Sequence, residues 1–482
     1  MKLFKKIAGF ILAFAMILAI AMPSVVMAAD TTYKLTLQNT VEGHTYEVYQ
    51  VFSGTLSTKN NKKVLSDLKW GSGVKADAYT ETAKAKAETL TDETTVRAFA
   101  KELVNQKKLS AATKTVQSTT GTTEIAGLAA GYYLVKDTDS SLANKNDSYT
   151  AYILQVVGDA TTSVKSDVPS SEKKVKDIND STDTETIEWQ DAADWDIGDE
   201  VPFKIEGTLP SNYDKYKKYT LKFHDKEEEG LTFKSETVKV FIDNTEITEG
   251  FRVVVNPEDN DTFDVVFDNL KTTSAKNNSV IRVEYKSVLN EKANLGKPGN
   301  KNTMYMEFSN NPNNEQGGEF GKTPDDTVIV FTYKVDVNKV DEQGNKLTGA
   351  EFTLEKKIKG TKDTWKAITK VPETAGDVFE FKGIDDGEYR LTETRAPANY
   401  DKLSDPIYFT VTAGHVDGAN PYLDTFSGNI TSGNVGTMTF TANKDSGILS
   451  IKVVNKPGSS LPETGGMGTT ILYAAGVILI LA

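Results

Sequence analysis

Strict alternation of apolar and polar residues runs through most of this chain of 482 residues. Examples are YTLKFHD from Tyr219, VKVFID from Val238, FDVVFDNL from Phe263 and VIRVEY from Val280. Successive side chains of a β-strand point to opposite faces, so a period of two predicts strands with one buried face. Gly, Asn, Asp and Pro break these runs, which is typical of β-sandwiches. We therefore predict an all-β fold of tandem immunoglobulin-like β-sandwich domains.

One segment departs from this period. Residues 76–103 are rich in Ala, Lys and Glu, and an apolar helical spacing joins Val96, Phe99, Ala100 and Leu103. A recurrence every three or four residues is the pattern of an amphipathic helix. The segment predicts a short helical insertion in the first domain.

Polar linkers divide the chain. VKSDVPSSEKKVKD surrounds Pro169, NNPNNEQGGEFGKTPDD covers residues 310–326, and NKPGSSLPE begins at Asn455. Such turn-rich stretches mark connections, and the length allows about three domains of ~150 residues. We predict a signal peptide at 1–28, an N-terminal sandwich at 29–167, a middle sandwich at 168–330, a third sandwich at 331–457 and a C-terminal sorting signal at 458–482.

Composition disfavours several classes of function. The net charge of −13 argues against nucleic-acid binding, which needs a basic surface. There is no cysteine to form a disulfide, and the three histidines are scattered without ligand spacing. The acidic stretch NPEDNDTFD at 256–264 lacks the register of an EF-hand, so a solvated turn is favoured over a calcium site. We predict no metal and no cofactor.

The two ends of the chain carry export and anchoring patterns. Lys2, Lys5 and Lys6 precede an apolar run at 7–22, and a small-residue site follows with cleavage expected after Ala28. An uncleaved anchor is the alternative, but the run is short for a membrane span. Near the other end, LPETGG precedes the apolar run TTILYAAGVILILA. This motif resembles the LPxTG wall-sorting signal of Gram-positive surface proteins, and its residues are Leu461, Pro462, Glu463, Thr464 and Gly465.

The sorting resemblance implies a partner enzyme and a location. A sortase cysteine is expected to attack between Thr464 and Gly465 and pass the acyl group to an amine. The amine belongs to peptidoglycan or to another subunit. The protein is then exported and anchored to the cell wall, on the extracellular surface.

A lysine stands on the apolar face of a strand in VDVNKVDEQGNKLTGAEF. Lys339 alternates with Val335 and Val337, although burial of an unpaired ammonium is costly. Two further strands end an apolar stripe in a polar residue in the same way, at Glu393 and Asn455. These segments, with GEYRLTETRAPANY and LSIKVVNKP, resemble a Cna B-type (SpaA-like) sandwich of bacterial surface proteins.

The resemblance implies an intramolecular isopeptide bond between Lys339 and Asn455, assisted by Glu393. Burial lowers the pKa of a lysine and raises that of a glutamate, so a neutral amine can attack the asparagine carbonyl and release ammonia. A protonated glutamate can shuttle the proton. The alternative is that Lys339 extends outward to solvent and Asn455 caps a strand.

The middle domain contains a second candidate set of a lysine, a carboxyl and an asparagine. DIGDEVPFKIEGTLP, LKFHDKEEEGLTF and GNKNTMYMEFSNNP resemble the pilin-type (Cna A-like) middle domain of fimbrial subunits. The resemblance implies a bond between Lys173 and Asn302 with Asp225 as the acid. Nearby residues of the same types leave the choice open: Lys174, Lys176 and Asn300.

The first domain lacks a matching trio. GLAAGYYLVKD and GIDDGEYRLTE share one pattern, which places Asp137 where the third domain has Glu393. Lys34 lies on the strand face opposite Leu35 and Leu37, and no asparagine ends TTSVKS. We expect no isopeptide bond there.

The whole chain is similar to the backbone pilins of sortase-assembled Gram-positive pili. That resemblance implies a shaft subunit whose partners are sortase, other copies of itself, minor pilins, peptidoglycan and host surface ligands. An acceptor lysine is required, and without a Y-P-K motif Lys165 occupies the comparable place. The alternatives are a singly displayed adhesin and a minor or basal pilin that binds a host ligand. A turnover enzyme has little support, because the only reacting groups act once.

Overall fold

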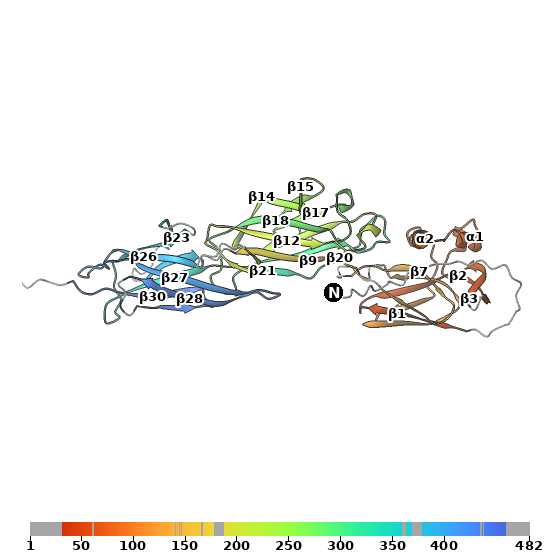
Figure 1. The fold of residues 1–482 in the computed structure, drawn as a ribbon, viewed down its shortest axis with the longest axis horizontal. Helices are drawn as coiled ribbons and strands as arrows, with labels where there is room; N and C mark the ends of the chain where they lie inside the picture. Colours follow the sequence, from red (N-terminus) through yellow and green to blue (C-terminus); the bar gives the residue numbers. More distant parts are fainter. Residues whose placement is uncertain are drawn as a thin grey trace, which may run out of the picture.

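The structure, a computed structural model, describes residues 31–458 except 60–61, 140, 144, 146, 165–166, 178–187, 359–362, 369–377, 434–435 and 437. The predicted signal peptide, the LPETG motif and Lys165 lie outside the described residues. The described chain is mostly β-sheet, and Figure 1 shows its sheets gathered into three bodies in a row. The prediction of tandem all-β sandwiches is confirmed.

The first body pairs a sheet of order β5-β1-β8 with a sheet of order β3-β2-β6-β7, in which β4 also lies beside β2. Its helices lie beside the second sheet. Its strands and helices are β1 (Tyr33–Thr40), β2 (Thr45–Lys59), β3 (Lys62–Trp70), α1 (Ala83–Glu88), α2 (Glu93–Asn105), β4 (Lys114–Gln117), β5 (Gly121–Leu128), β6 (Gly131–Asp137), β7 (Ala151–Val156) and β8 (Ala160–Ser163).

The predicted helical insertion divides into a 3₁₀ turn at Ala76–Ala78 and the two helices. Asp92 begins the second helix, because its side chain caps α2 by accepting a hydrogen bond from the backbone N–H of Thr95. Phe99 and Leu103 of α2 are buried in one core with Phe52 of β2. The insertion therefore packs on the sandwich as an integral part of it.

The middle body pairs a sheet of order β10-β9-β12-β18-β14-β15 with one of order β11-β21-β19-β13-β17-β16, and β20 pairs with β19. Short 3₁₀ turns occur at Tyr213–Lys215 and Leu270–Thr272. Its strands are β9 (Ser170–Asp177), β10 (Glu188–Gln190), β11 (Ala192–Asp194), β12 (Glu200–Thr208), β13 (Leu221–Glu227), β14 (Leu231–Ile242), β15 (Thr245–Ile247), β16 (Arg252–Val255), β17 (Phe263–Phe267), β18 (Val280–Leu289), β19 (Asn300–Ser309), β20 (Phe320–Lys322) and β21 (Asp326–Phe331).

The third body pairs a sheet of order β25-β22-β30-β29 with a sheet of order β24-β23-β26-β27-β28. Its first and last strands, β22 and β30, are parallel neighbours. Its strands are β22 (Tyr333–Val340), β23 (Glu351–Lys357), β24 (Trp365–Ile368), β25 (Val378–Ile384), β26 (Gly387–Arg395), β27 (Ile407–Val416), β28 (Tyr422–Ser432), β29 (Phe440–Asn443) and β30 (Ile448–Val454).

Alternation in the sequence becomes alternation of burial. Along β12, Val201, Phe203 and Ile205 are fully buried, while the residues between them are partly exposed. The same pattern places Lys173 on the inner face of β9 and Lys339 on the inner face of β22. Strand geometry alone thus directs these two lysines into the sandwich cores.

The bodies meet at two joints. Asn310, which follows β19, accepts a hydrogen bond from the Tyr149 backbone at 2.8 Å and donates one to the Leu142 carbonyl at 3.0 Å. At the other joint only Thr332 separates β21 from β22, and Ile329 of the middle body belongs to the third core. Both joints are therefore direct contacts between neighbouring sandwiches.

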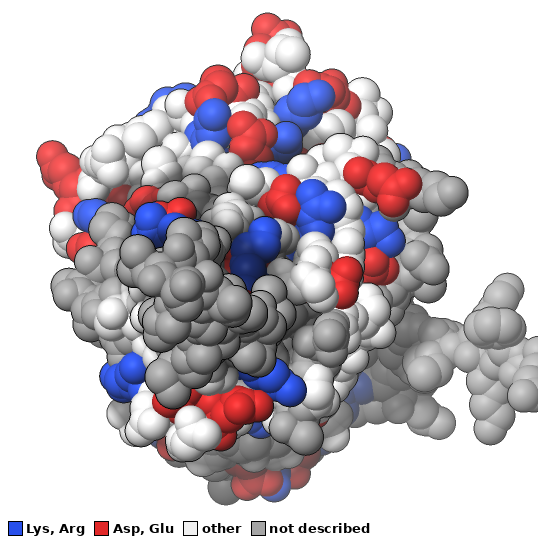
Figure 2. Space-filling view, turned by 90° about the vertical axis from the view of Figure 1, so that its left-hand side faces the viewer, with Lys and Arg blue, Asp and Glu red and all other residues white. Residues whose placement is uncertain are grey.

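The surface carries charges of both signs. Figure 2 views the end of the molecule formed by the third body, where lysine and arginine side chains are interspersed with aspartate and glutamate. Within the described residues, no helix is both long and apolar enough to cross a membrane.

Candidate lysine–asparagine sites

Lys339, Glu393 and Asn455 meet in the core of the third body. Lys339 on β22 lies opposite Val453 of β30, so Asn455 follows two residues further along the same inner face. Glu393 reaches them from β26 in the facing sheet. All three side chains are buried. The structure therefore brings together the three residues that the sequence singled out.

The carboxyl of Glu393 lies between the two nitrogens. Asn455 Nδ2 donates to its two oxygens at 3.0 and 3.1 Å, and Lys339 Nζ lies 3.9 Å from Oε1. The Leu403 backbone N–H donates to Glu393 Oε2 at 2.8 Å, while Lys339 Nζ donates to the Val453 carbonyl at 2.7 Å. The carboxyl and the amine are thus both held in place by backbone groups.

Burial changes the protonation of the lysine in this group. It lowers the pKa of Lys339 to about 8, and the nearby Glu393 charge opposes this shift only in part. A larger share of the amine is therefore neutral near pH 7 than in a solvated lysine. Among the described residues, Asn455 Oδ1 is buried without a hydrogen-bond partner, so none of them competes for its carbonyl oxygen.

Lys173, Asp225 and Asn302 form a second buried group in the middle body. Lys173 lies on β9 of one sheet, and Asp225 and Asn302 lie on β13 and β19 of the other. None of the three is exposed to solvent. Lys173 Nζ donates a hydrogen bond to Asp225 Oδ2. Burial lowers the pKa of the lysine and raises that of the aspartate, while their mutual attraction opposes both shifts.

The neighbouring candidates face elsewhere. Lys174 lies on the other face of β9 and pairs with Asp191 at 2.6 Å. Asn300 uses its side-chain amide to donate to the backbone carbonyls of Asn294 and Val330. Lys176 lies over the ring of Trp189. Of the residues considered from the sequence, Lys173 and Asn302 are the pair whose side chains converge.

Two residues of this group were missed from the sequence. Tyr285 on β18 accepts hydrogen bonds from Lys173 Nζ at 2.6 Å and from Asn302 Nδ2 at 2.9 Å. Glu227 accepts one from Asn302 Nδ2 at 3.2 Å. The sequence contained a pattern that could have identified each of them. Tyr285 alternates with the inward-facing residues of VIRVEY, and Glu227 lies two residues after Asp225, which puts both carboxyls on one face of β13.

The first body holds a different buried group. His44 Nδ1 lies 2.8 Å from Asp137 Oδ1, and its Nε2 lies 2.7 Å from Asp147 Oδ2. Burial by itself lowers the pKa of His44, but the hydrogen bonds with the two carboxylates outweigh it and raise the pKa to about 9. Lys34 lies at the surface with Glu124. Among the described residues, this body has no lysine–carboxyl–asparagine trio.

The acidic stretch at 256–264 folds against β13. The Nδ1 atom of His224 and carboxylate oxygens of Asp259, Asp261 and Asp264 lie within 4.8 Å of one another. Lys222 Nζ lies 3.0 Å from Asp259 and 2.7 Å from Asp264. A protein cation therefore already neutralises part of this cluster.

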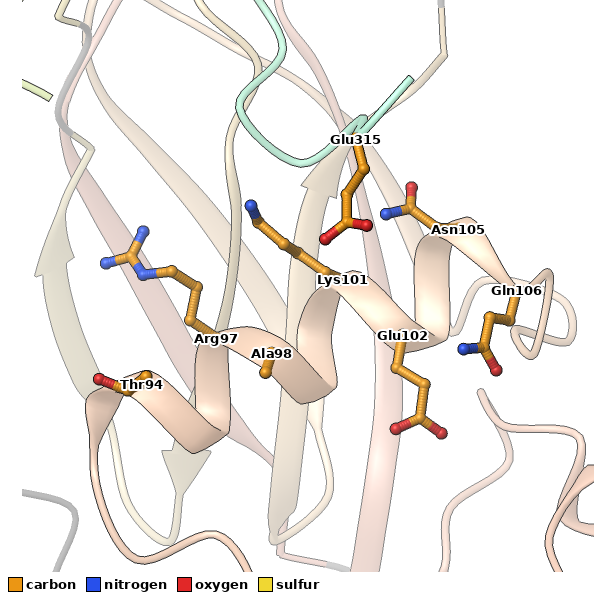
Figure 3. Close-up of a pocket in the computed structure, with 8 residues that line it drawn as sticks. All are labelled: Thr94, Arg97, Ala98, Lys101, Glu102, Asn105, Gln106 and Glu315. Atoms are coloured by element: carbon orange, nitrogen blue, oxygen red, sulfur yellow. The ribbon is translucent and has the colours of Figure 1, made fainter. Parts of the chain in front are cut away.

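A groove of about 430 Å³ lies where the first and middle bodies meet. It is lined by α2 on one side and by Glu315 of the connection from β19 to β20 on the other (Figure 3). Glu315 points toward α2 (Figure 3), whereas Lys101 Nζ donates a hydrogen bond to the backbone carbonyl of Lys215 at 3.2 Å. Partial burial lowers the pKa of Lys101, and the Glu315 charge opposes the shift. The groove thus presents an amine with a depressed pKa.

Known proteins resemble this chain at two levels, in the sequence of the third domain and in the fold of the whole chain. Residues 333–421 match the SpaA family, described as a prealbumin-like fold domain. The chain is 26% identical over 373 residues to the trypsin-resistant surface T6 protein of Streptococcus pyogenes serotype M6. That match takes in 72% of this chain and 60% of the relative, so the chain spans less than two thirds of the relative's length.

Two solved structures share the fold. The T6 backbone pilin of serotype M6 S. pyogenes, described as a modular three-domain structure, aligns with a TM-score of 0.60 and 19% identity over 90% of this chain and 100% of that one. The full-length major pilin SpaD of Corynebacterium diphtheriae aligns with a TM-score of 0.52 and 17% identity over 90% and 99%. At these identities the likeness establishes the fold.

Proposed function

We propose that this chain, which is similar to SpaA-type pilins in its third domain and in its overall fold, is the structural shaft subunit of a sortase-polymerised pilus. The domain match, the surface-protein relative and the two shared folds together support a SpaA-type pilin on a Gram-positive cell surface. In this function each subunit is joined covalently to its neighbours, and the last subunit is joined to peptidoglycan.

The observation that carries the proposal is the pair of buried lysine–carboxyl–asparagine groups. In the third domain, the Lys339 amine attacks Cγ of Asn455, ammonia leaves, and Glu393 moves the proton between the two nitrogens. In the middle domain, the Lys173 amine attacks Cγ of Asn302, and ammonia leaves. An amide in each core crosslinks a chain that has no cysteine. Such bonds suit a subunit that must resist extension and proteolysis.

Assembly requires two further reacting groups. Sortase cleaves between Thr464 and Gly465 and transfers the threonine acyl group to Lys165 of another copy. Autocatalysis in the cores happens once for each chain, so the protein is a substrate of sortase and has no turnover of its own. Minor pilins and host surface ligands complete the expected partners.

Lys101 is a second candidate for the acceptor amine. It lies in the groove between the first and middle bodies, where burial lowers its pKa (Figure 3). A neutral amine is the form that attacks an acyl group. The alternative function, a singly displayed adhesin or a minor or basal pilin, needs neither lysine, and the missing Y-P-K motif keeps it open.

Electrophoresis of boiled cell-wall extracts tests the function. Wild-type chains expressed with their sortase are expected to give a ladder of high-mass species that disappears in Lys165→Ala and persists in Lys101→Ala. If the ladder is lost in Lys101→Ala but persists in Lys165→Ala, Lys101 is the acceptor lysine. A single band for the wild type contradicts the shaft function and supports the singly displayed protein.

A further inference from the structure

Two carboxyl groups divide the contacts of the middle-domain site between them. Asp225 accepts a hydrogen bond from Lys173 Nζ, and Glu227 accepts one from Asn302 Nδ2 at 3.2 Å. The acid predicted from the sequence, Asp225, thus contacts the attacking nitrogen, and a different residue contacts the leaving nitrogen.

The third domain makes the corresponding contacts with one carboxyl. Glu393 accepts from Asn455 Nδ2 at 3.0 Å and lies 3.9 Å from Lys339 Nζ. On β13, by contrast, Asp225 and Glu227 are two residues apart on one face, and Glu227 stands opposite Asn302 in the strand register. The register therefore gives each nitrogen of the middle site its own carboxyl.

We propose that Glu227 is the catalytic acid for the Lys173–Asn302 bond, with Asp225 as the base and Tyr285 positioning the two nitrogens. The inference rests on the proposed function, because it assumes that the bond forms. It assigns a role to a glutamate and a tyrosine that the sequence did not single out.

The environment of Glu227 suits an acid. Ser287 Oγ and Asn302 Nδ2 both donate to Oε1, at 2.5 and 3.2 Å, whereas Oε2 is buried and has no hydrogen-bond partner among the described residues. Burial and the Asp225 charge raise the pKa of Glu227 to about 8, although the Ser287 hydrogen bond and the Lys173 charge oppose the shift, so the group is protonated near pH 7.

Tyr285 holds the reacting atoms around one oxygen. Its hydroxyl accepts from Lys173 Nζ at 2.6 Å and from Asn302 Nδ2 at 2.9 Å, and donates to Asp225 Oδ2 at 2.8 Å. The ring is fully buried and stacks on Phe203. Such fixed placement favours reaction between the two groups.

The protons balance in this scheme. Asp225 takes one proton from the Lys173 ammonium, and the Nζ lone pair forms a bond to Cγ of Asn302. Glu227 gives its proton to Nδ2 as the Cγ–Nδ2 bond breaks, and ammonia leaves. The second Nζ proton then passes to Glu227. The products are an amide, ammonia and a protonated Asp225, and Glu227 is regenerated.

The test follows bond formation in the full chain after cell-free synthesis, with samples quenched in denaturant and the linked peptide measured by mass spectrometry. Glu227→Gln is expected to slow the Lys173–Asn302 bond by ~100-fold or more, the usual effect of a lost general acid. Tyr285→Phe is expected to slow it by about tenfold, the equivalent of one hydrogen bond. Glu229→Gln, an exposed position in the turn after β13, is the matched control and keeps the wild-type rate.

The pH dependence of the bond-formation rate distinguishes a catalytic role of Glu227 from a purely structural one. Among the described residues, the titratable groups facing Glu227 are Asp225 on its own strand, Lys173 on β9 and Tyr285 on β18. The wild-type rate is expected to fall as pH rises through about 8, where Glu227 loses its proton. Tyr285→Phe keeps this fall and Glu227→Gln loses it.

The Lys339–Asn455 bond in the same chain reports on folding. A wild-type rate in Glu227→Gln overturns the inference while leaving the crosslink intact. A wild-type chain with no middle-domain bond overturns the crosslink and the inference together. If Glu227→Gln fails to fold, the pH profile of the wild-type chain tests the role of Glu227 instead. A rate of Lys173–Asn302 bond formation that does not fall above pH 8 contradicts that role.

Discussion

His44 illustrates at the scale of one residue how burial and partners compete. Its ring is buried between Asp137 and Asp147, and each ring nitrogen faces one carboxylate. The hydrogen bonds outweigh the cost of burial, so the charged imidazolium is the favoured form. Asp137 occupies the place where the third domain has Glu393, but Asp137 pairs with the His44 ring, whereas Glu393 lies between a lysine and an asparagine.

The stability of the first domain is expected to depend on His44 and pH. Its pKa is raised from an ordinary 6.5 to about 9 on folding. The ion pairs therefore contribute fully below pH 6.5, and roughly 3 kcal/mol is lost as pH rises through about 9. Calorimetry of the full chain across this range is the measurement.

One variant tests this pH dependence of stability, and a second serves as its control. His44→Gln is expected to remove the pH dependence of stability, whereas Lys34→Ala, which breaks an exposed pair with Glu124, is expected to leave that dependence unchanged. The same pH dependence in His44→Gln as in the wild type contradicts the assignment.

At the scale of elements, the two predicted bonds differ in what they join. Lys339 belongs to β22, and Asn455 directly follows β30, the parallel neighbour of β22 in the same sheet. Lys173 and Asn302 belong to β9 and β19, which lie in different sheets of the middle domain. One bond secures the last strand of a domain to its first, and the other secures two sheets to each other.

Glu393→Gln is expected to leave the third domain folded but without its crosslink. The full chain then stays heavier by one ammonia, because glutamine cannot shuttle the proton. Loss of a link that closes a loop of this length removes about 4–5 kcal/mol, by analogy with a disulfide. Hydrogen exchange of the β30 amides is expected to accelerate, and intact mass reports the bond directly.

Glu388→Gln is the control on the same strand, since its exposed carboxylate pairs only with Lys357 among the contacts described. It is expected to match the wild type in mass and exchange. A Glu393→Gln chain that is as light as the wild type shows that the carboxyl is not needed.

At the scale of the whole molecule, the joint between the middle and third domains is rich in buried charge. Asp196 lies before β12, and Asp385 lies between β25 and β26. Lys356 of β23 lies 3.4 Å from Asp196 Oδ2 and also pairs with Asp385. All three are buried, so the lysine neutralises carboxylates that water cannot reach.

Lys356→Met is expected to loosen this joint. It leaves two buried carboxylates without their lysine, at a cost of about 3–5 kcal/mol. Calorimetry is expected to show a lower transition temperature, and solution scattering a broader range of domain arrangements. Among the described residues, the neighbouring Lys357 pairs with the exposed Glu388, so Lys357→Met serves as the control. Equal losses in both variants contradict the role of Lys356.

The alternation of apolar and polar residues determined much of this protein by itself. A period of two selects strands, and it also selects the inward face, so the sequence alone directs Lys173, Lys339 and Asn455 into the cores. Capping at Asp92, which divides the predicted helix, depends on local backbone geometry and does not follow from periodicity.

Only the tertiary structure decided which inward residues meet. Pairing of β9 with β12, and of β13 with β19, is set by contacts distant in sequence, and a shift of one residue reverses every side chain. That register separates Lys173 from Lys174. It also brings Glu227 opposite Asn302, a contact that no local pattern encodes. Local periodicity determines which face a side chain takes, but its partners depend on how the sheets pack.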